Sequence, residues 1–506
     1  MIEPLWSTVD GEVCKLYCGE VRDVLSELPE QSVHCVVTSP PYWGLRDYGT
    51  GTWEGGDENC DHIERTAEDT HKSSAPESRG VGHPVTNAAY QSQVSQFKNV
   101  CKKCGAIRTD SQIGSEEVPD CLGWATGKQC GECHICVITD VFRQVKRVLR
   151  DDGTLWLNYG DTYAGTGRTG GGEQGKIAEN YRATATKGKG TWQPPPKGIP
   201  AGNLVGIPWR VAFALQADGW ILRQDIIWHK PSPMPESVRN RCTKAHEYIF
   251  LLTKKGSGYF YDQEVIREES IQGSLSVEKY KQTKMRGSWQ DQRGDGKSHY
   301  KKNDANITPP GGRNKRSVWT VASEAYPGAH FATFPTKLIT PCILAGSSER
   351  GCCAECGAPY ERVTESERQE TRPGTDSKVD RFRNSSRYVD HRGTNTDNAK
   401  HIGNRDTGRH ITTTQTVGWQ KTCNCETDET RPCVVLDPFV GSGTTCVVSL
   451  RHGRHAIGVD LNEEYLTKQA VRRISNFALE EGRVDLISSH YYDSKTSDKI
   501  EQGNLF

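Results

Sequence analysis

Two prolines between a hydroxyl and two aromatic rings stand near the start of the chain, in Thr38-Ser39-Pro40-Pro41-Tyr42-Trp43. Proline fixes φ and has no N–H, so this stretch is stiff and its carbonyl groups can only accept hydrogen bonds. The hydroxyl and the aromatic faces suit a flat ring that bears an amino group. The same residues also suit a rigid turn between a strand and a loop, so the rest of the chain must decide between the two interpretations.

A second stretch, from Asp437 to Thr445, combines an acid, a glycine turn and the start of a helix. Glycine lets backbone N–H groups approach a ligand, and the positive end of the helix favours a carboxylate. Asp460 ends the next predicted strand, about twenty residues on, where an acid accepts hydrogen bonds from ribose hydroxyls. The pattern predicts half of a site for a nucleoside-containing cofactor.

Alternating strand and helix patterns around both stretches predict an α/β fold. Residues 13–18 and 32–38 are predicted strands on either side of a helix at 21–28, which indicates a parallel sheet with a right-handed crossover. Further helices are expected at 141–149, 209–216 and 445–450, and further strands at 154–158, 221–228, 246–253, 434–437 and 456–460. Ligands bind at the carboxyl ends of the strands in such sheets, where Ser39 and Asp437 fall.

Length and composition indicate a protein of several domains with polar insertions. Two or three domains are expected for 506 residues, and a mean hydropathy of -0.69 is low for a compact globule. Lys+Arg and Asp+Glu each number 64, so any affinity for nucleic acid must come from local patches. Without a membrane-length apolar run or an export signal, we expect a soluble, cytoplasmic protein with no membrane partner.

Nineteen cysteines occur mainly in short-spaced pairs, which in a large chain without an export signal favour metal binding over disulfides. Three groups each offer four ligands and no open position, as in structural zinc sites. The groups are Cys60, His62, Cys101 and Cys104; Cys121, Cys130, Cys133 and Cys136; and Cys353, Cys356, Cys423 and Cys425. Cys352 is a neighbour that competes with Cys353, and reduced, buried cysteines are the alternative for every group.

Residues 279–316 contain eleven Lys or Arg residues against three acids, with Tyr280, Trp289 and Tyr300 among them. Basic and aromatic side chains together suit a nucleic-acid contact, the charges for phosphates and the rings for bases. A solvated loop is the alternative. The polar stretches at 65–99, 160–190 and 361–421 lack periodicity and are predicted as loops.

With both stretches in view, the chain resembles the amino-methyltransferases of DNA, which use S-adenosylmethionine. The family carries a S/D-P-P-Y/F tetrapeptide and a D-P-F-x-G-S-G-T-T loop, matched here by Ser39 to Tyr42 and by Asp437 to Thr445. The tetrapeptide precedes the loop, an order that resembles the β group, in which the specificity region lies between the two. The similarity covers residues 10–50, 139–255 and 330–475.

The resemblance implies a Rossmann-like methyltransferase sheet with Cys-rich zinc-binding insertions, and it assigns the residues of the site. The implied catalytic residues are Ser39, Pro40, Pro41 and Tyr42. The implied cofactor-binding residues are Glu20, Phe334, Asp437, Phe439, Gly441, Ser442, Gly443, Thr444 and Asp460. Glu20 stands where the family often has an acid, usually Asp, that faces the adenine, and Phe334 belongs to a short motif that lines the methionine pocket.

The implied chemistry is methylation of an exocyclic amine in double-stranded DNA. Ser39 Oγ and the Pro40 carbonyl would accept the two amine hydrogens and orient the nitrogen lone pair toward the methyl sulfonium. Tyr42 would stack on a base rotated out of the duplex. Serine in the first motif position resembles the cytosine-N4 members, so cytosine N4 is favoured and adenine N6 stays open. These residues identify neither the recognition sequence nor a restriction partner for a restriction-modification system.

The predicted organisation interleaves the core with insertions. The catalytic half of the core is 1–50 and 139–255, and the cofactor-binding half is 330–350 and 432–480. Insertions are a Cys-rich zinc region at 51–138, a basic region for DNA recognition at 256–329 and a zinc knuckle with a loop at 351–431, and 481–506 is a tail. The rival functions are a catalytically inactive, zinc-dependent nucleic-acid-binding protein and a methyltransferase of RNA or protein.

Overall fold

The computed structural model divides the chain into two compact units. The first consists of Met1–Tyr259, Val318–Ser347 and Pro432–Phe506, and the second of Phe260–Ser317 and Ser348–Arg431. The structure describes residues 2–8, 13–43, 52–57, 59–60, 101, 103–109, 112–114, 116, 118–164, 199–233, 235–236, 238–268, 313–324, 333–370 and 410–483. Within these ranges no helix is both long and apolar enough to cross a bilayer.

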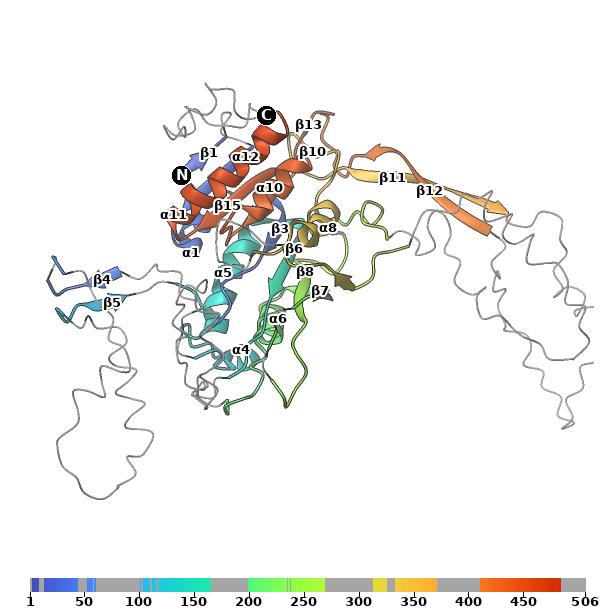
Figure 1. Cartoon of the computed structure of the whole chain (residues 1–506). Coiled ribbons are helices and arrows are strands. Elements are labelled where there is room, and N and C mark those ends of the chain that lie inside the picture. The colour runs from blue at the N-terminus through green and yellow to red at the C-terminus, as the bar shows by residue number, and fades with distance from the viewer. Residues whose placement is uncertain are drawn as a thin grey trace, which may run out of the picture. The chain divides into compact units, whose positions relative to one another are not determined.

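A nine-stranded sheet runs through the first unit in the order β1-β2-β15-β14-β3-β6-β8-β7-β9 (Figure 1). Its strands are β1 (Trp6–Ser7), β2 (Cys14–Cys18), β3 (Val33–Thr38), β6 (Leu149–Tyr159), β7 (Ile221–His229), β8 (His246–Thr253), β9 (Val318–Thr320), β14 (Val434–Asp437) and β15 (His455–Asp460). The predicted α/β fold is confirmed, but a wholly parallel sheet is wrong. Strands β2, β15, β14, β3 and β6 are parallel, whereas β8 is antiparallel to both β6 and β7. The described part of the β7–β8 connection holds no helix that could serve as a crossover, so the chain simply turns back.

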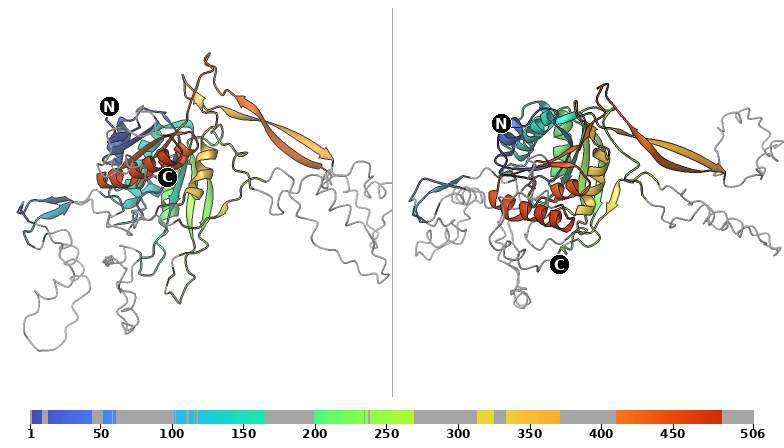
Figure 2. Two further views of the ribbon diagram at one scale, coloured as in Figure 1. Left: turned by 45° about the horizontal axis from the view of Figure 1, so that its top comes forward. Right: turned by 90° about the horizontal axis from the view of Figure 1, so that it is seen from above.

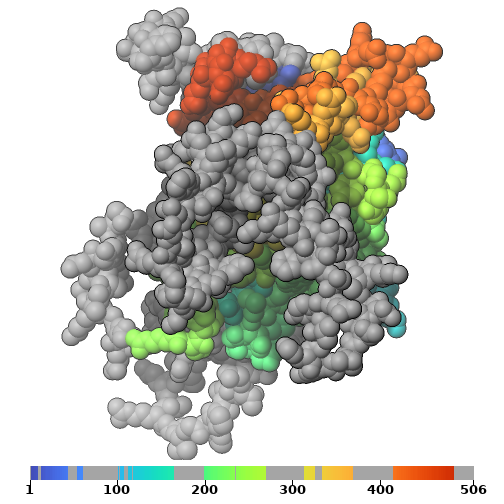
Figure 3. Space-filling view, turned by 90° about the vertical axis from the view of Figure 1, so that its right-hand side faces the viewer, coloured from blue at the N-terminus to red at the C-terminus, as the bar shows by residue number. Residues whose placement is uncertain are grey.

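Helices cover both faces of this sheet (Figure 2). One layer contains α1 (Val21–Glu27), α5 (His134–Val148) and α6 (Ile207–Ala217), and the other contains α8 (Thr336–Gly346), α10 (Thr444–Arg451) and α12 (Arg472–Glu480). Every residue of β3 is buried as a result, which explains why its sequence is mostly apolar. Its one internal polar side chain, His34, accepts a hydrogen bond from the Val434 amide at 3.0 Å. After β15, α11 (Glu463–Tyr465) and a π-helical turn, η3 (Leu466–Val471), lead into α12, which reaches the surface (red in Figure 3).

Two element boundaries differ from the prediction. Helix α5 begins at His134, earlier than the predicted start at 141, and β6 begins directly after it at Leu149. The sequence predicted this strand only from residue 154, but Asp151-Asp152-Gly153 are already part of β6. Asp151 is accommodated because its carboxylate accepts hydrogen bonds from Gln31 Nε2 at 2.9 Å and Lys254 Nζ at 3.3 Å. Tertiary partners therefore override the local turn signal.

In the described part of the chain, three two-stranded ribbons lie outside the main sheet, and one of them, β11–β12, occupies a stretch that was predicted as a loop. In the second unit β11 (Glu361–Glu370) pairs antiparallel with β12 (His410–Gln420), and β10 (Cys352–Cys353) pairs with β13 (Thr430–Arg431). In the first unit β4 (Thr52–Glu54) pairs with β5 (Ile107–Thr109), and a short helix, α4 (Gly123–Thr126), precedes α5. The β11–β12 ribbon was missed because its polar strands lack the apolar alternation on which sequence prediction depends.

Gly346 allows α8 to lie close against the sheet. A Cβ at this position would be 2.5 Å from Thr154 Oγ1 and 2.6 Å from Cys35 Sγ. We predict that Gly346→Ala lowers the free energy of unfolding by about 1–3 kcal/mol, because overpacking forces these neighbours to shift. Thermal unfolding measures the effect, with Gly256→Ala as the matched control because no atom lies within 4 Å of a Cβ there. Equal melting temperatures for the two variants would contradict this account of α8 packing.

Candidate functional site

The site lies where the chain order of the sheet reverses direction. From β14 the chain passes through α10 to β15 on one side, whereas from β3 it passes through α5 to β6 on the other side. Ligands bind at such a switch point, outside the carboxyl ends of the strands. The register pairs Val435 with Cys35 and Leu436 with Val36, so Asp437 and Thr38 end the two strands side by side.

A buried carboxylate joins the two predicted halves of the site. Asp437 is 1% exposed, and it accepts hydrogen bonds from Thr38 Oγ1 and Thr445 Oγ1, each at 2.6 Å. The amide of Phe439 adds a third donor at 3.1 Å. Burial raises the pKa of Asp437 to about 6, although these donors favour its charged form. The ends of β3 and β14 are therefore held together by one side chain.

The glycines of the second stretch have the conformations that the prediction needs. Gly441 and Gly443 have φ values of +49° and +79°, which other residues rarely adopt. A Cβ on Gly443 would lie 3.1 Å from the Cα of Ala470 in η3, so only glycine fits beneath this turn. Among the described residues no atom lies within 4 Å of a Cβ at Gly441, so the space beside this residue is open, while its amide donates to Asp460.

The hydroxyls of Ser442 and Thr444 face α12. Arg473 Nη1 donates to Ser442 Oγ at 3.1 Å and to Thr444 Oγ1 at 2.6 Å, and both residues are buried. These side chains thus fix the loop, and its backbone is the part suited to a ligand. Helix α10 begins after Gly443 without a side-chain cap, which suits an anion at its amino end.

Asp460 and Glu20 lie at the same edge of the sheet. The register pairs Asp460 with Cys18, and the Gly19 amide donates to the Asp460 carbonyl at 3.1 Å. The Asp460 carboxylate accepts from the amides of Gly441 at 3.0 Å and Asn462 at 2.9 Å, and burial raises its pKa. The Leu461 amide also interacts with this carboxylate, and since a carboxylate has about four acceptor sites, acceptor capacity stays available for a hydroxyl group.

Glu20 has a structural task that the sequence did not reveal. It is the N-cap of α1, where its Oε2 accepts from the amides of Arg22 at 2.8 Å and Asp23 at 3.3 Å. Its Oε1 accepts from Arg22 Nε at 3.0 Å. Its contact with an adenine stays a prediction. Phe334 is half-buried beside Pro335, the N-cap of α8, and Phe439 is half-buried against the core.

The loop that was predicted to be catalytic, residues 39–43, is held through the Tyr42 hydroxyl and is called the catalytic loop below. Ser39 Oγ donates to this hydroxyl at 3.2 Å, and the hydroxyl lies 2.9 Å from Glu247 Oε2 and 3.1 Å from Asn158 Oδ1. The ring of Tyr42 stacks on Tyr159 with centroids 5.2 Å apart and an interplanar angle of 23°. Burial, together with the charge of Glu247, raises the pKa of Tyr42, so its hydroxyl stays a neutral donor.

Sequence reasoning missed Asn158, Tyr159 and Glu247. Glu247 also forms an ion pair with Lys230, whose Nζ lies 4.2 Å from the ring centroid of Trp228. A polar residue at the end of an apolar strand and an acid at the start of another were the signals available. Such signals name no partner, because β6 and β8 come from distant parts of the chain.

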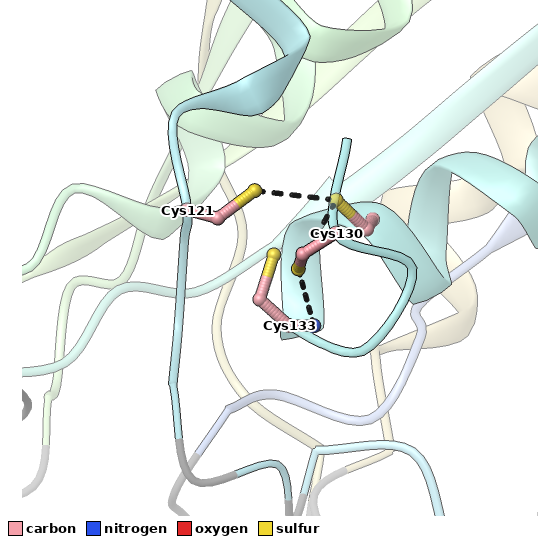
Figure 4. A group of neighbouring side chains, drawn as sticks. Cys121, Cys130 and Cys133 are labelled. Atoms are coloured by element: carbon pink, nitrogen blue, oxygen red, sulfur yellow. Dashed lines mark hydrogen bonds between the residues drawn. The ribbon is translucent and has the colours of Figure 1, made fainter. Parts of the chain in front are cut away.

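The structure brings cysteines of all three predicted metal groups together. In the four-cysteine cluster of Cys121, Cys130, Cys133 and Cys136, all Sγ atoms lie within 4.8 Å of one another. The Cys136 Sγ lies 3.6 Å from that of Cys121 and 3.9 Å from that of Cys130, and Figure 4 shows three of the side chains converging. A tetrahedral zinc ion with four thiolate ligands requires Sγ atoms about 3.8 Å apart, so the donor set fits zinc.

The other two groups gather in the same way. The Sγ atoms of Cys353, Cys356, Cys423 and Cys425 lie within 4.8 Å of one another, as do those of Cys60, Cys101 and Cys104. His62 lies outside the described residues. Cys352 is not part of the cluster that contains Cys353. Its Sγ instead donates to the Arg431 carbonyl at 3.4 Å.

Most of the basic stretch at 279–316 lies outside the described residues, which include only its last four. Two of its cations, Arg313 and Arg316, form ion pairs with Glu268 at 3.1 and 2.9 Å. These two charges are therefore partly compensated within the second unit.

Comparisons with known proteins agree with this geometry. A family model described as DNA methylase, N6/N4 type, matches residues 33–354 and 428–472. The Type II methyltransferase M.SmaI of Serratia marcescens is 30% identical over 467 residues, 91% of each chain, and M.Cfr9I of Citrobacter freundii is 30% identical over 451 residues, 89% of this chain and 84% of the relative. The structure of the PvuII DNA methyltransferase (cytosine-N4-specific) is similar over 99% of this chain and 94% of its own, with 13% identity and a TM-score of 0.39, which is too low to support an argument.

The buried Asp437 predicts a specific pH dependence of stability. Its pKa of about 6 exceeds that of an unfolded Asp, so the folded state binds more protons between about pH 4 and pH 6 and stability falls as the pH rises through this range. Asp437→Asn removes this pH-dependent loss. Between about pH 4 and pH 6 the free energy of unfolding of the variant, relative to that of the wild type, should rise by up to about 3 kcal/mol. Thermal unfolding of the ligand-free protein measures the effect, with the exposed Asp225→Asn as control. Parallel pH curves for Asp437→Asn and the wild type would contradict the assignment.

Proposed function

Because the chain belongs to the N6/N4 DNA methylase family, we propose that it transfers the methyl group of S-adenosylmethionine to N4 of cytosine in double-stranded DNA. Adenine N6 is the alternative acceptor. The observation that carries the proposal is the pair of hydrogen bonds from Thr38 and Thr445 to Asp437, because they hold the end of the strand that precedes Ser39 beside the glycine turn and the start of α10. The acceptor site and the donor site thus share one edge of the sheet.

The donor site uses the carboxyl ends of β14, β15 and β2. The uncapped amino end of α10 would bind the carboxylate of S-adenosylmethionine, and Asp460 would accept hydrogen bonds from its ribose hydroxyls. Glu20 and Phe334 would flank its adenine and methionine portions, as the resemblance implies. When bound, this cofactor supplies a methyl group on a positively charged sulfur.

The acceptor site works through hydrogen-bond acceptors. The Ser39 hydroxyl donates a hydrogen bond to the Tyr42 hydroxyl. The lone pairs of Ser39 Oγ therefore stay available to accept an amine hydrogen. The Pro40 carbonyl would accept the second hydrogen, and the two contacts favour the positive charge that develops on nitrogen during transfer. One face of Tyr42 rests on Tyr159, and we propose that its other face stacks on the flipped base.

Cytosine is favoured because Ser39 occupies the first position of the tetrapeptide. A base analysis decides the matter: we expect N4-methylcytosine in nuclease digests of duplex DNA methylated by the protein, detected by mass spectrometry. Finding N6-methyladenine alone would replace cytosine by adenine as the substrate. Competition among duplex DNA, RNA and peptide acceptors separates this function from methylation of RNA or protein.

The rival function, an inactive zinc-dependent nucleic-acid-binding protein, retains DNA binding but transfers no methyl group. The complete set of Ser39, Tyr42, Asp437 and Gly443 argues against it. Saturable binding of S-adenosylmethionine that is lost in Asp437→Ala would favour the enzyme, since this variant leaves Thr38 and Thr445 without their shared acceptor.

The acceptor role of Ser39 and Tyr42 is tested by substitution. We predict that Ser39→Ala and Tyr42→Ala keep the dissociation constant for S-adenosylmethionine but lower kcat by about 100-fold or more, because each removes a contact at the reacting amine or its support. Tyr42→Phe isolates the hydroxyl, and Ser26→Ala, on the exposed side of α1, is the control. Wild-type turnover in both alanine variants would remove the proposed acceptor site.

We further propose that the three cysteine groups hold structural zinc. The Sγ distances support this, and in two of the groups four thiols gather into a complete ligand set that leaves no position for a substrate. Metal analysis of the purified full chain should find between about one and three zinc ions per chain. A value below one would remove zinc from the description of the protein.

A further inference from the structure

We propose that the four-cysteine cluster is a zinc site that positions the catalytic loop through a chain of buried side chains. The proposal rests on the function proposed above and adds a task for one metal site within it. The series of contacting side chains leads from Glu116 through His134 and Tyr159 to the catalytic loop. None of these residues belongs to the motifs that indicated a methyltransferase.

The cluster joins two separate segments of the first unit. Cys121 directly follows residues 118–120, whereas Cys133 and Cys136 lie at the start of α5. The amide of His134 donates to the Val118 carbonyl, and the amide of Ile135 donates to the Pro119 carbonyl, each at 3.1 Å. Residues 118–120 thereby satisfy the free N–H groups of the helix. A metal ion bound by the four thiolates would fix this segment to the helix.

His134 carries the connection from the metal site toward the loop. Its ring is completely buried, with Nδ1 2.9 Å from Glu116 Oε2 and Nε2 2.6 Å from the Tyr159 hydroxyl. The Tyr159 hydroxyl also lies 3.4 Å from the Pro41 carbonyl, and its ring is the one that supports Tyr42. A displacement of His134 is therefore transmitted to the residues that face the amine.

Glu116 holds the loop from a second direction. Its backbone carbonyl accepts from Trp43 Nε1 at 2.8 Å, and its carboxylate accepts from the Gly114 amide at 2.9 Å. Gly114 lies so close to the loop that a Cβ there would be 3.1 Å from the Tyr42 carbonyl. The segment that precedes Cys121 thus contacts Trp43 and passes close to Tyr42.

Thiols alone would hold this arrangement poorly. Protonated cysteines are weak hydrogen-bond partners, and Cys130 is exposed, so water competes for its contacts. Four zinc–sulfur bonds would replace these weak contacts by a rigid centre. Loss of the metal should loosen the loop while the donor site, which is built on β14, β15 and α10, stays intact.

Cys130→Ser tests the proposal in the full-length protein, with Cys242→Ser as control because Cys242 is exposed and outside the clusters. We expect Cys130→Ser to lose about one zinc ion per chain. Hydrogen–deuterium exchange should rise in peptides covering 39–43 but not in those covering 437–445. We expect kcat to fall on the order of 10- to 100-fold, as for a misplaced catalytic group, with the dissociation constant for S-adenosylmethionine unchanged within about 3-fold.

Tyr159→Phe breaks the series of side-chain contacts between His134 and the catalytic loop and leaves the metal ligands unchanged. It keeps the ring under Tyr42 but removes the hydroxyl that contacts His134 and Pro41. We expect wild-type zinc content together with faster exchange at 39–43 and a lower kcat. This variant also decides the question if Cys130→Ser does not fold.

Three results would overturn the proposal. The first is equal zinc content in Cys130→Ser and the wild type. The second is loss of zinc with exchange and kcat like those of Cys242→Ser. The third is unchanged exchange at 39–43 in Tyr159→Phe. A wild-type protein that methylates no DNA would instead remove the proposed function, while zinc content and exchange would still test the link between metal and loop.

Discussion

One carboxylate determines how the site is assembled. Asp437 is buried at the end of β14, where burial disfavours its charge, and it is stabilised by hydroxyls from the end of β3 and from the start of α10. Unless those donors are in place the charged group is costly, so the native register of β3 against β14 and the position of α10 are selected together. The hydrogen bonds of Asp437 therefore also fix the positions of the loops that follow β3 and β14.

The sequence predicted the features that depend on local pattern. Buried strands such as β3 and β14 are short apolar runs that end in a polar residue, and the glycine turn before α10 requires positive φ at Gly441 and Gly443. The sequence also placed Ser39 and Asp437 at strand ends, and the structure joins these ends through Thr38 and Asp437. Cysteine spacing likewise predicted which thiols would meet.

Features that depend on partners far apart in the sequence could not be predicted from local pattern. The β11–β12 ribbon has no apolar alternation, and β6 continues through Asp151 because Gln31 and Lys254 satisfy its carboxylate. The support of Tyr42 was also hidden, because Asn158 and Glu247 meet only after β6 and β8 have paired. A residue's type suggests what it can bind, whereas the pairing of the strands decides what it meets.

The reversed direction of β8 has a structural consequence. Parallel strands bring only their last residues to the catalytic edge, but β8 brings its first, and Glu247 reaches Tyr42 from there. The connection between β7 and β8, residues 230–245, therefore starts and finishes at the catalytic edge. A change in the length of this connection shifts the register of no strand, so the sheet can keep the contact between Glu247 and Tyr42 while the connection itself varies.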